Sequence, residues 1–154
     1  MARRPSAQSG YSLVELVITL ALLLIVTTLA APSFLSYYRS ARVRSGAQAV
    51  SAYLNQGRQL AIKTNTPVCV DYTTTSMQYR QSTCGGATIG VAGLVTTGNS
   101  IHLPENISLT STASPIFGTL GNATTGATFT VTDTVSSKTL HVTVAASGRI
   151  TVDP

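Results

Sequence analysis

Charged side chains are scarce in this sequence, since Asp, Glu, Lys and Arg together make up 10% of its 154 residues. The formal net charge of +5 is small, and a charge so modest does not by itself indicate a nucleic-acid-binding protein. Hydrophobic residues account for 44%, and much of this excess lies in one block, Leu13 to Ala31. The length suits one compact domain with an appendage.

Residues that commonly carry out catalysis are few and poorly placed for it. The two histidines, His102 and His141, lie far apart in strand-like stretches and lack the close spacing of a helical metal site. No serine lies in a G-x-S-x-G elbow, and the glycine pairs lack the lysine of a phosphate-binding loop. The sequence predicts no catalytic residue, no metal, no cofactor and no enzyme activity. A membrane-anchored enzyme that uses His102 or His141 is the alternative.

Cysteine is limited to Cys69 and Cys84, which do not form the C-x-x-C motif of redox proteins. In an exported domain they would form one disulfide that closes a short loop. Such a disulfide is worth roughly 3 kcal/mol in the chain-entropy model. The alternative is a pair of buried thiols.

The N-terminus has no ordinary signal-peptide cleavage site. Residues Met1 to Gly10 are polar and basic, and the apolar block follows them. A secretory signal would end in a small-residue A-x-A site, but Ala30 and Ala31 run on into Pro32 and further helix-like sequence. A cleaved signal peptide is therefore disfavoured. A plain membrane anchor is an alternative, and the positive-inside rule would put the basic leader in the cytoplasm.

Glu15 is the anomaly of the apolar block. A carboxylate in a membrane segment costs on the order of 2.5–3.5 kcal/mol at mid-bilayer and less near its edge. No cation lies within a helical turn of Glu15 in the sequence. An acid with no partner in its own chain indicates a functional role, with the partner supplied from elsewhere.

The segment from Gly10 to Leu16, GYSLVEL, resembles the class III signal of type IV prepilins, in which a glutamate is the fifth residue after the cut. The resemblance implies that a prepilin peptidase cleaves after Gly10 and methylates the new N-terminus at Tyr11, where the family usually has phenylalanine. It also implies that Glu15 meets the N-terminal amine of a neighbouring subunit during assembly. Pro32 falls where many pilins carry a helix-bending proline.

A helix from Tyr11 to Arg39 would be roughly 42 Å long at 1.5 Å per residue, about the thickness of a bilayer with its headgroups. Arg39, Arg42 and Arg44 would then lie at the level of the lipid phosphates. They point in different directions around the helix, so they form a collar. Membrane lipid is therefore an expected partner before assembly.

The helical pattern continues beyond the apolar block. Apolar residues of one stripe recur at spacings of four, three, four and seven: Val43, Ala47, Val50, Leu54 and Ala61. Their small size predicts close packing on a sheet, and the Thr64–Pro67 stretch ends the helix. We expect a leader at 1–10, a transmembrane and assembly helix at 11–38, an amphipathic helix at 39–65, and a β-rich domain at 66–154.

The β-rich part begins with a predicted hairpin formed by Val68–Tyr72 and Met77–Arg80. Gly, Asn, Ser and Thr separate the further expected strands, which are Ser100–Leu103, Ile107–Thr110, Ala127–Thr132, Thr139–Ala145 and Arg149–Val152. The stretches Gly85–Asn99 and Thr110–Thr125 have little pattern and are expected to be loops.

This half resembles the GspH/FimT family of pseudopilins. The resemblance rests on the helix end at Arg58–Asn65, on Phe117-Gly118 with Gly121, and on the terminal Ser147–Ile150 hairpin. It implies an α+β, pilin-like fold, with one long N-terminal helix packed on antiparallel sheet. It also implies a minor pilin or pseudopilin that initiates, caps or functionalises a type IV pilus or a type II secretion pseudopilus.

The same resemblance implies the partners and the location. The partners would be other pilins, the prepilin peptidase and the inner-membrane assembly platform. The chain would cross the inner membrane once, with its C-terminal domain outside the cytoplasm, before it enters the filament.

DNA uptake is the alternative function. Some members of the family resemble DNA receptors for natural transformation, with basic residues near the terminal Gly-Arg motif. Here Gly148-Arg149 is followed by no second arginine, and phosphate binding depends on several cations acting together. Lys138, Arg149 and Arg80 would have to converge in space to form such a site.

Overall fold

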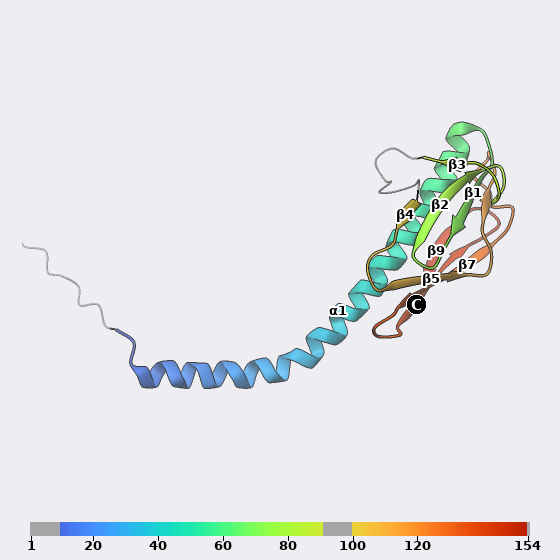
Figure 1. Cartoon of the computed structure of the whole chain (residues 1–154). Helices are drawn as coiled ribbons and strands as arrows, with labels where there is room; N and C mark the ends of the chain where they lie inside the picture. Colours follow the sequence, from blue (N-terminus) through green and yellow to red (C-terminus); the bar gives the residue numbers. More distant parts are fainter. Residues whose placement is uncertain (1–9, 91–99, 154) are drawn as a thin grey trace, which may run out of the picture. The chain divides into compact units, whose positions relative to one another are not determined.

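The computed structural model describes residues 10–90 and 100–153 (Figure 1), and of residues 29–33 it describes the backbone alone. The chain divides into two compact units, Met1–Tyr38 and Arg39–Pro154. In the described part, one helix, α1 (Leu13–Thr64), precedes all the strands. These are β1 (Val68–Tyr72), β2 (Ser76–Gln81), β3 (Thr88–Ile89), β4 (Ser100–His102), β5 (Ile107–Ser111), β6 (Ile116–Phe117), β7 (Ala127–Asp133), β8 (Thr139–Val144) and β9 (Ile150–Asp153).

The helix α1 ends where the sequence predicts that it should. Asn65 follows its last residue with a positive φ of 50°, the left-handed conformation that commonly terminates helices. The Thr64 hydroxyl donates to the Leu60 carbonyl at 2.8 Å, and Pro67 prevents the helix from continuing. The chain then turns directly into β1.

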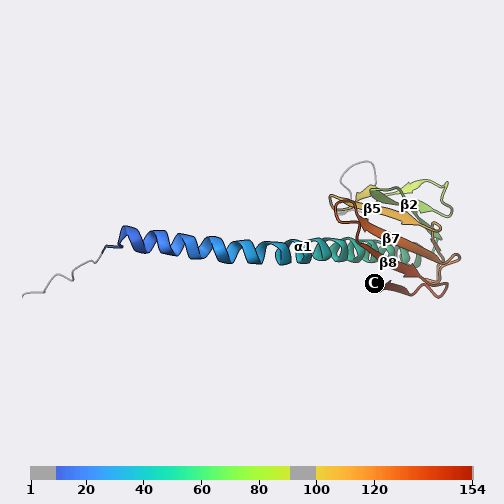
Figure 2. The same ribbon diagram turned by 90° about the horizontal axis from the view of Figure 1, so that it is seen from below.

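The strands form two antiparallel sheets. The first has the order β3-β2-β1-β6, with β4 also paired to β2, and the second has the order β5-β7-β8-β9. The second sheet lies beside the C-terminal part of α1, with β5, β7 and β8 adjacent (Figure 2). The predicted α+β fold with a long helix on antiparallel sheet is confirmed.

The core lies between α1 and the two sheets. All five residues of the predicted apolar stripe are at most 2% exposed, which confirms the stripe. Two buried glycines on the same helix set how closely it approaches the sheets. A Cβ at Gly57 would lie 2.8 Å from Cγ2 of Val70 in β1, and one at Gly46 would lie 3.2 Å from Ile107 in β5. Each glycine therefore allows close contact with a different sheet.

A tyrosine holds the first sheet to the helix. Tyr79 of β2 is 1% exposed, and its hydroxyl donates to the Tyr53 carbonyl at 2.9 Å, with Gln56 Oε1 at 3.3 Å. Burial, with a smaller contribution from Tyr53, raises the pKa of Tyr79 well above its usual range. The phenol therefore stays protonated and able to donate.

A buried carboxylate holds the second sheet to the helix. The alternation of buried and half-buried residues along β7 puts Asp133 on the inner face, where it is fully buried. Its carboxylate lies 3.5 Å from the Arg42 guanidinium and accepts from Ser136 Oγ at 2.5 Å and from the Val135 N–H at 3.3 Å. Burial opposes ionisation, but these hydrogen bonds and Arg42 outweigh it and lower the pKa of Asp133.

Two predicted loops contain short strands, so the sequence prediction was wrong there. The expected loop Gly85–Asn99 contains β3, and the expected loop Thr110–Thr125 contains β6; residues 91–99 lie outside the described part. Each of these strands is two residues long and pairs with a longer strand, β3 with β2 and β6 with β1. Such short pairings depend on tertiary contacts and leave no periodic pattern in the sequence.

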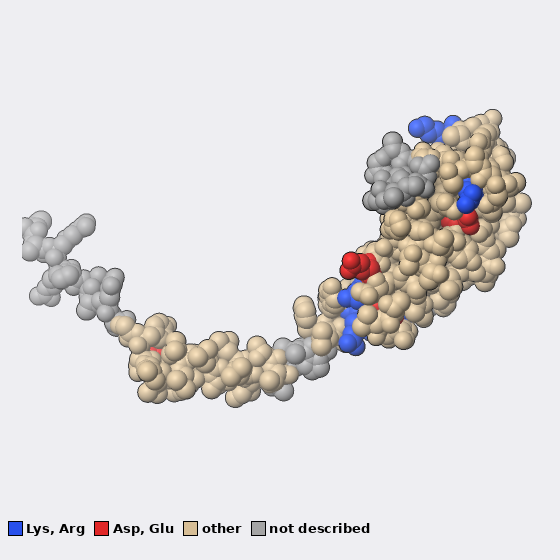
Figure 3. Space-filling model, viewed as in Figure 1, with Lys and Arg blue, Asp and Glu red and all other residues tan. Residues whose placement is uncertain are grey.

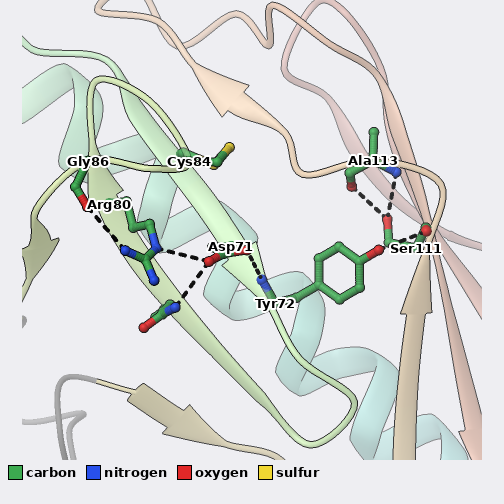
Figure 4. The surroundings of a disulfide bond; sticks show 9 residues. Asp71, Tyr72, Arg80, Cys84, Gly86, Ser111 and Ala113 are labelled. Atoms are coloured by element: carbon green, nitrogen blue, oxygen red, sulfur yellow. Dashed lines mark hydrogen bonds and ion pairs between the residues drawn. A yellow bond between two sulfur atoms is a disulfide. The ribbon is translucent and has the colours of Figure 1, made fainter.

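The predicted disulfide is present. Cys69 of β1 and Cys84 are bonded, with their Cα atoms 5.1 Å apart. The bond ties the turn after β2 back to β1, and the same turn is held by a hydrogen bond from Arg80 to the Gly86 carbonyl at 3.2 Å (Figure 4). Cys69 is fully buried, whereas Cys84 is half-buried.

Replacing Asp133 with Asn should destabilise the unit 39–154, because the buried pair with Arg42 loses its charge. We expect a loss of roughly 1.5–3 kcal/mol at pH 7, measured by urea unfolding of that fragment, which contains every buried apolar side chain of the described part. Asp153→Asn, at an exposed acid of β9, is the matched control. Equal stability of the two variants would contradict this role.

The same pair should make stability depend on pH in a defined window. Folding lowers the pKa of Asp133, so as the pH falls this carboxylate is protonated in the unfolded chain before it is protonated in the folded one. The stabilisation that the ionised Asp133 contributes is therefore complete above the ordinary Asp pKa of about 3.9. It is lost as the pH falls from there through the folded-state pKa. Asp133→Asn should therefore lose less stability than wild type between pH 5 and acid, as followed by circular dichroism. If the stability of both proteins changed with pH in parallel, the Arg42–Asp133 pair would be excluded as a source of the pH dependence.

Removing both cysteines, as Cys69→Ala with Cys84→Ala, should lower the free energy of unfolding by about 3 kcal/mol, since the unfolded chain gains the entropy of an open loop. Urea unfolding of the fragment 39–154 measures the loss. Wild type in excess dithiothreitol should behave like the double variant. If reduction has no effect on wild type, the bond does not contribute to stability.

Candidate functional site

The start of α1 is built as a regular helix cap. The first backbone hydrogen bond runs from the Leu16 N–H to the Ser12 carbonyl at 3.1 Å, so Ser12 is the N-cap residue and Glu15 lies in the first turn. Serine followed by glutamate three residues later is the capping-box spacing, a sequence signal that the predictions above did not use. A carboxylate there interacts favourably with the positive end of the helix dipole.

Glu15 is exposed, and no Lys or Arg of the described residues lies within 4.0 Å of it. The capping position makes a carboxylate tolerable at this site but supplies no counter-charge. A cation from outside the chain could therefore approach Glu15 without displacing a cation of the described residues.

The helix behind Glu15 has an apolar surface on all sides. Tyr11 is 82% exposed and Leu13 77%. Large apolar side chains continue with more than half of their surface exposed: Val14, Leu16, Val17, Ile18, Leu20, Leu22, Leu23, Leu24, Ile25 and Val26. Isolated exposed apolar residues are ordinary, but a continuous patch of this kind marks an interaction surface with protein or lipid.

The threonine hydroxyl groups of this segment are already satisfied within the helix. Thr19 donates to the Leu16 carbonyl, Thr27 to Leu23 and Thr28 to Ile25, each at 2.8 Å. Threonines that bond back to their own helix expose no unpaired donor to an apolar neighbour. Across residues 10–90 and 100–153, however, no helix combines the length and the mean hydropathy needed to cross a bilayer.

The predicted processing residues lie just before the helix. Gly10 is exposed, with no atom within 4 Å of an added Cβ, and Tyr11 follows it. Residues 1–9 of the predicted leader lie outside the described part. The helix runs through Pro32, but the side chain of Pro32 also lies outside the described part. The predicted bend at this residue therefore stays a prediction.

The three basic residues considered for DNA binding are not brought together. Arg80 donates to Asp71 at 2.9 Å, and the same carboxylate also accepts from Gln78 at 3.0 Å (Figure 4). Lys138 immediately precedes β8, and Arg149 follows its far end. The six residues of β8 separate these two by about 20 Å at 3.4 Å per residue.

The Gly148-Arg149 motif has a packing role in the fold. Gly148 has φ 81°, and a Cβ there would lie 1.9 Å from the Gly121 carbonyl oxygen, so only glycine fits. Beneath both glycines lies Arg58, whose Nε is buried without a hydrogen-bond partner among the described residues. Arg149 itself is exposed. Sequence reasoning missed Arg58, because its neighbours are distant in the chain.

The histidines also lie apart. His102 is exposed in β4 of the first sheet, whereas His141 lies in β8 of the second, with Nδ1 3.2 Å from Thr130 Oγ1. In the described residues no three His, Cys, Asp or Glu side chains are grouped to hold a metal ion. The histidines therefore do not form a common site.

Comparisons with known proteins agree with this geometry. The family model "Type II transport protein GspH" matches residues 46–148, and the model "Prokaryotic N-terminal methylation motif" matches residues 5–31. No curated protein matches the sequence.

Three solved structures share the fold. The type IV minor pilin FimU of Pseudomonas aeruginosa is 13% identical, with a TM-score of 0.56 over 77% of this chain and 92% of its own. The minor pseudopilin EpsH from the type 2 secretion system of Vibrio cholerae is 16% identical, with a TM-score of 0.56 over 72% of this chain and 95% of its own. GspH of E. coli is 12% identical, with a TM-score of 0.57 over 73% of this chain and 87% of its own.

Proposed function

The chain belongs to the GspH family of type II transport proteins, and from that premise we propose that it is a minor pilin or pseudopilin. Such a subunit initiates, caps or functionalises a type IV pilus or a type II secretion pseudopilus. The observation that carries the proposal is the segment 11–26, whose helical part is apolar on every side and has one carboxylate in its first turn.

The apolar segment requires a partner. Burial of apolar surface contributes about 25 cal/mol per Å², so a helix with this many exposed Leu, Ile and Val side chains is driven out of water. Lipid would cover it before assembly, when the chain crosses the inner membrane once with residues 39–154 outside the cytoplasm. The corresponding helices of other pilins or pseudopilins would cover it in the filament.

Glu15 supplies the specificity of that assembly. In a filament core of apolar helices a lone carboxylate is expensive, and an incoming α-amino group would neutralise it. The amine would be that of Tyr11 in a neighbouring copy or another subunit, exposed when a prepilin peptidase cuts after Gly10 and methylates the new terminus. The inner-membrane assembly platform would bring the two subunits together.

DNA uptake is not favoured, because Arg80 is engaged by Asp71 and the other two basic residues flank opposite ends of β8. Several phosphate contacts must act together for tight DNA binding. Arg80, Lys138 and Arg149 therefore do not form one phosphate-binding surface.

Glu15→Ala should prevent incorporation into filaments while leaving membrane insertion unchanged, because the variant keeps its apolar surface but loses the counter-charge for the amine. Immunoblots of sheared filaments and of membrane fractions measure the two properties separately. We expect at least a tenfold loss of the variant from filaments, corresponding to about 1.4 kcal/mol.

Glu105→Ala is the matched control, since it removes an exposed acid of the globular unit. It should enter filaments as wild type does. Normal incorporation of Glu15→Ala would exclude the proposed pairing with the amine.

Gly10→Val should block processing, because the side chain occupies the position next to the proposed scissile bond. Intact-mass and N-terminal analysis of the membrane-extracted protein should find N-methyl-Tyr11 as the first residue of wild type and Met1 or Ala2 in the variant. Gly85→Val, at another glycine with open space around an added Cβ, should be processed normally. A wild-type protein that keeps its first ten residues would refute the processing step.

A further inference from the structure

Two cations from distant parts of the chain meet at the end of the globular unit where α1 enters it. Lys138 Nζ donates to Ser40 Oγ at 2.6 Å, across 98 residues of sequence. Arg44 lies four residues after Ser40 and therefore on the same face of α1. Blue side chains are grouped at this end of the unit in Figure 3, with a red acidic side chain beside them.

The two cations line one pocket. It has a volume of about 170 Å³ and is lined by Ser40, Val43, Arg44, Lys138, Thr139 and Leu140. That is smaller than the roughly 300–1,000 Å³ of pockets that hold drug-sized ligands, so it suits a group of a few heavy atoms. Hydroxyl groups of Ser40 and Thr139 accompany the cations, and Val43 and Leu140 supply an apolar side.

Among the described residues, neither cation of this pocket lies within 4.0 Å of a carboxylate oxygen. The ion pairs of that part of the chain are Arg42–Asp133 and Arg80–Asp71, and neither includes Arg44 or Lys138. Asp133 is buried and directed toward Arg42, Ser136 and Val135. Two like charges that line one small pocket repel each other, and an anion between them would remove that cost.

The position of the pocket along the chain identifies the anion. Arg39 is the first cation after the apolar segment, and Ser40 follows it directly. If that segment lies in the bilayer, as the proposed function requires, residues 39–44 lie at headgroup level. The Lys138–Ser40 hydrogen bond brings the β7–β8 turn to the same level.

We infer that the pocket between Arg44 and Lys138 binds the phosphate group of an anionic membrane phospholipid. This inference rests on the proposed function, because it takes the apolar segment to be in lipid. The Arg44 guanidinium and the Lys138 ammonium hold the phosphate oxygens, and Ser40 and Thr139 offer hydroxyl groups beside them. The contact fixes the β7–β8 turn against the membrane surface until the subunit leaves the bilayer.

Native mass spectrometry of the full chain in detergent micelles tests the site. Dioleoylphosphatidylglycerol should be retained in preference to dioleoylphosphatidylcholine. Arg44→Gln with Lys138→Gln should reduce the apparent affinity for the anionic lipid by roughly 10–30-fold, because each cation near an anionic surface contributes about fivefold. Arg149→Gln, at the far end of β8, removes an exposed cation as a matched control and should retain the lipid as wild type does.

Three outcomes overturn the inference: equal retention of the two lipids, equal loss in the Arg149 variant, or full displacement of the lipid by an equal concentration of inorganic phosphate. The last result would mean that the site takes a soluble anion. Lipid retention in micelles does not depend on filament assembly, and the Glu15 experiment does not depend on this pocket. A failure of one proposal is therefore distinguishable from a failure of the other.

Discussion

The close approach of α1 to two separate sheets is the contact on which the globular unit depends. Gly46 faces β5 and β7, while Gly57 faces β1 and β2. Any side chain at these points would have to displace core residues, and protein interiors tolerate little displacement. Because both sheets pack on the same helix, neither has a complete core without it. The helix thus packs against both sheets and contributes to both halves of the core.

Polar contacts at two points along the helix fix how the sheets lie on it. Tyr79 bonds to the helix backbone at Tyr53, and Arg42 pairs with Asp133, more than two helical turns earlier. Apolar packing is not directional, whereas hydrogen bonds and buried ion pairs have defined geometry. Removing one member of such a pair leaves the other uncompensated, so both contacts specify position as well as adding stability.

The two units divide the apolar surface of the protein between them. The large side chains of the globular unit are buried within one molecule, whereas those of residues 11–26 are exposed and need lipid or other subunits. Charges follow the same division. Glu15 is the one acid of the described helix before Arg39, and the next charged residues, Arg39, Arg42 and Arg44, belong to the globular unit. The folded core of the globular unit therefore does not depend on what covers residues 11–26.

Local patterns in the sequence were enough to predict the helix, its apolar stripe, the longer strands and the candidate role of Glu15. Helical and strand periodicities, a helix-ending Asn before Pro67 and an unpaired acid in an apolar run are all readable within a few residues. The pairing of Cys69 with Cys84 was predictable because the hairpin between them brings the chain back on itself.

Only the tertiary structure decided which distant residues meet. The strand β6 exists because β1 offers it a free edge, and Asp133 could be placed in the core only once the alternation of β7 was known to face Arg42. Arg58 beneath Gly121 and Lys138 beside Ser40 join segments far apart in sequence. Periodicity reports the environment of each residue along its own element, whereas contacts between elements depend on how those elements pack, which no short stretch of sequence encodes.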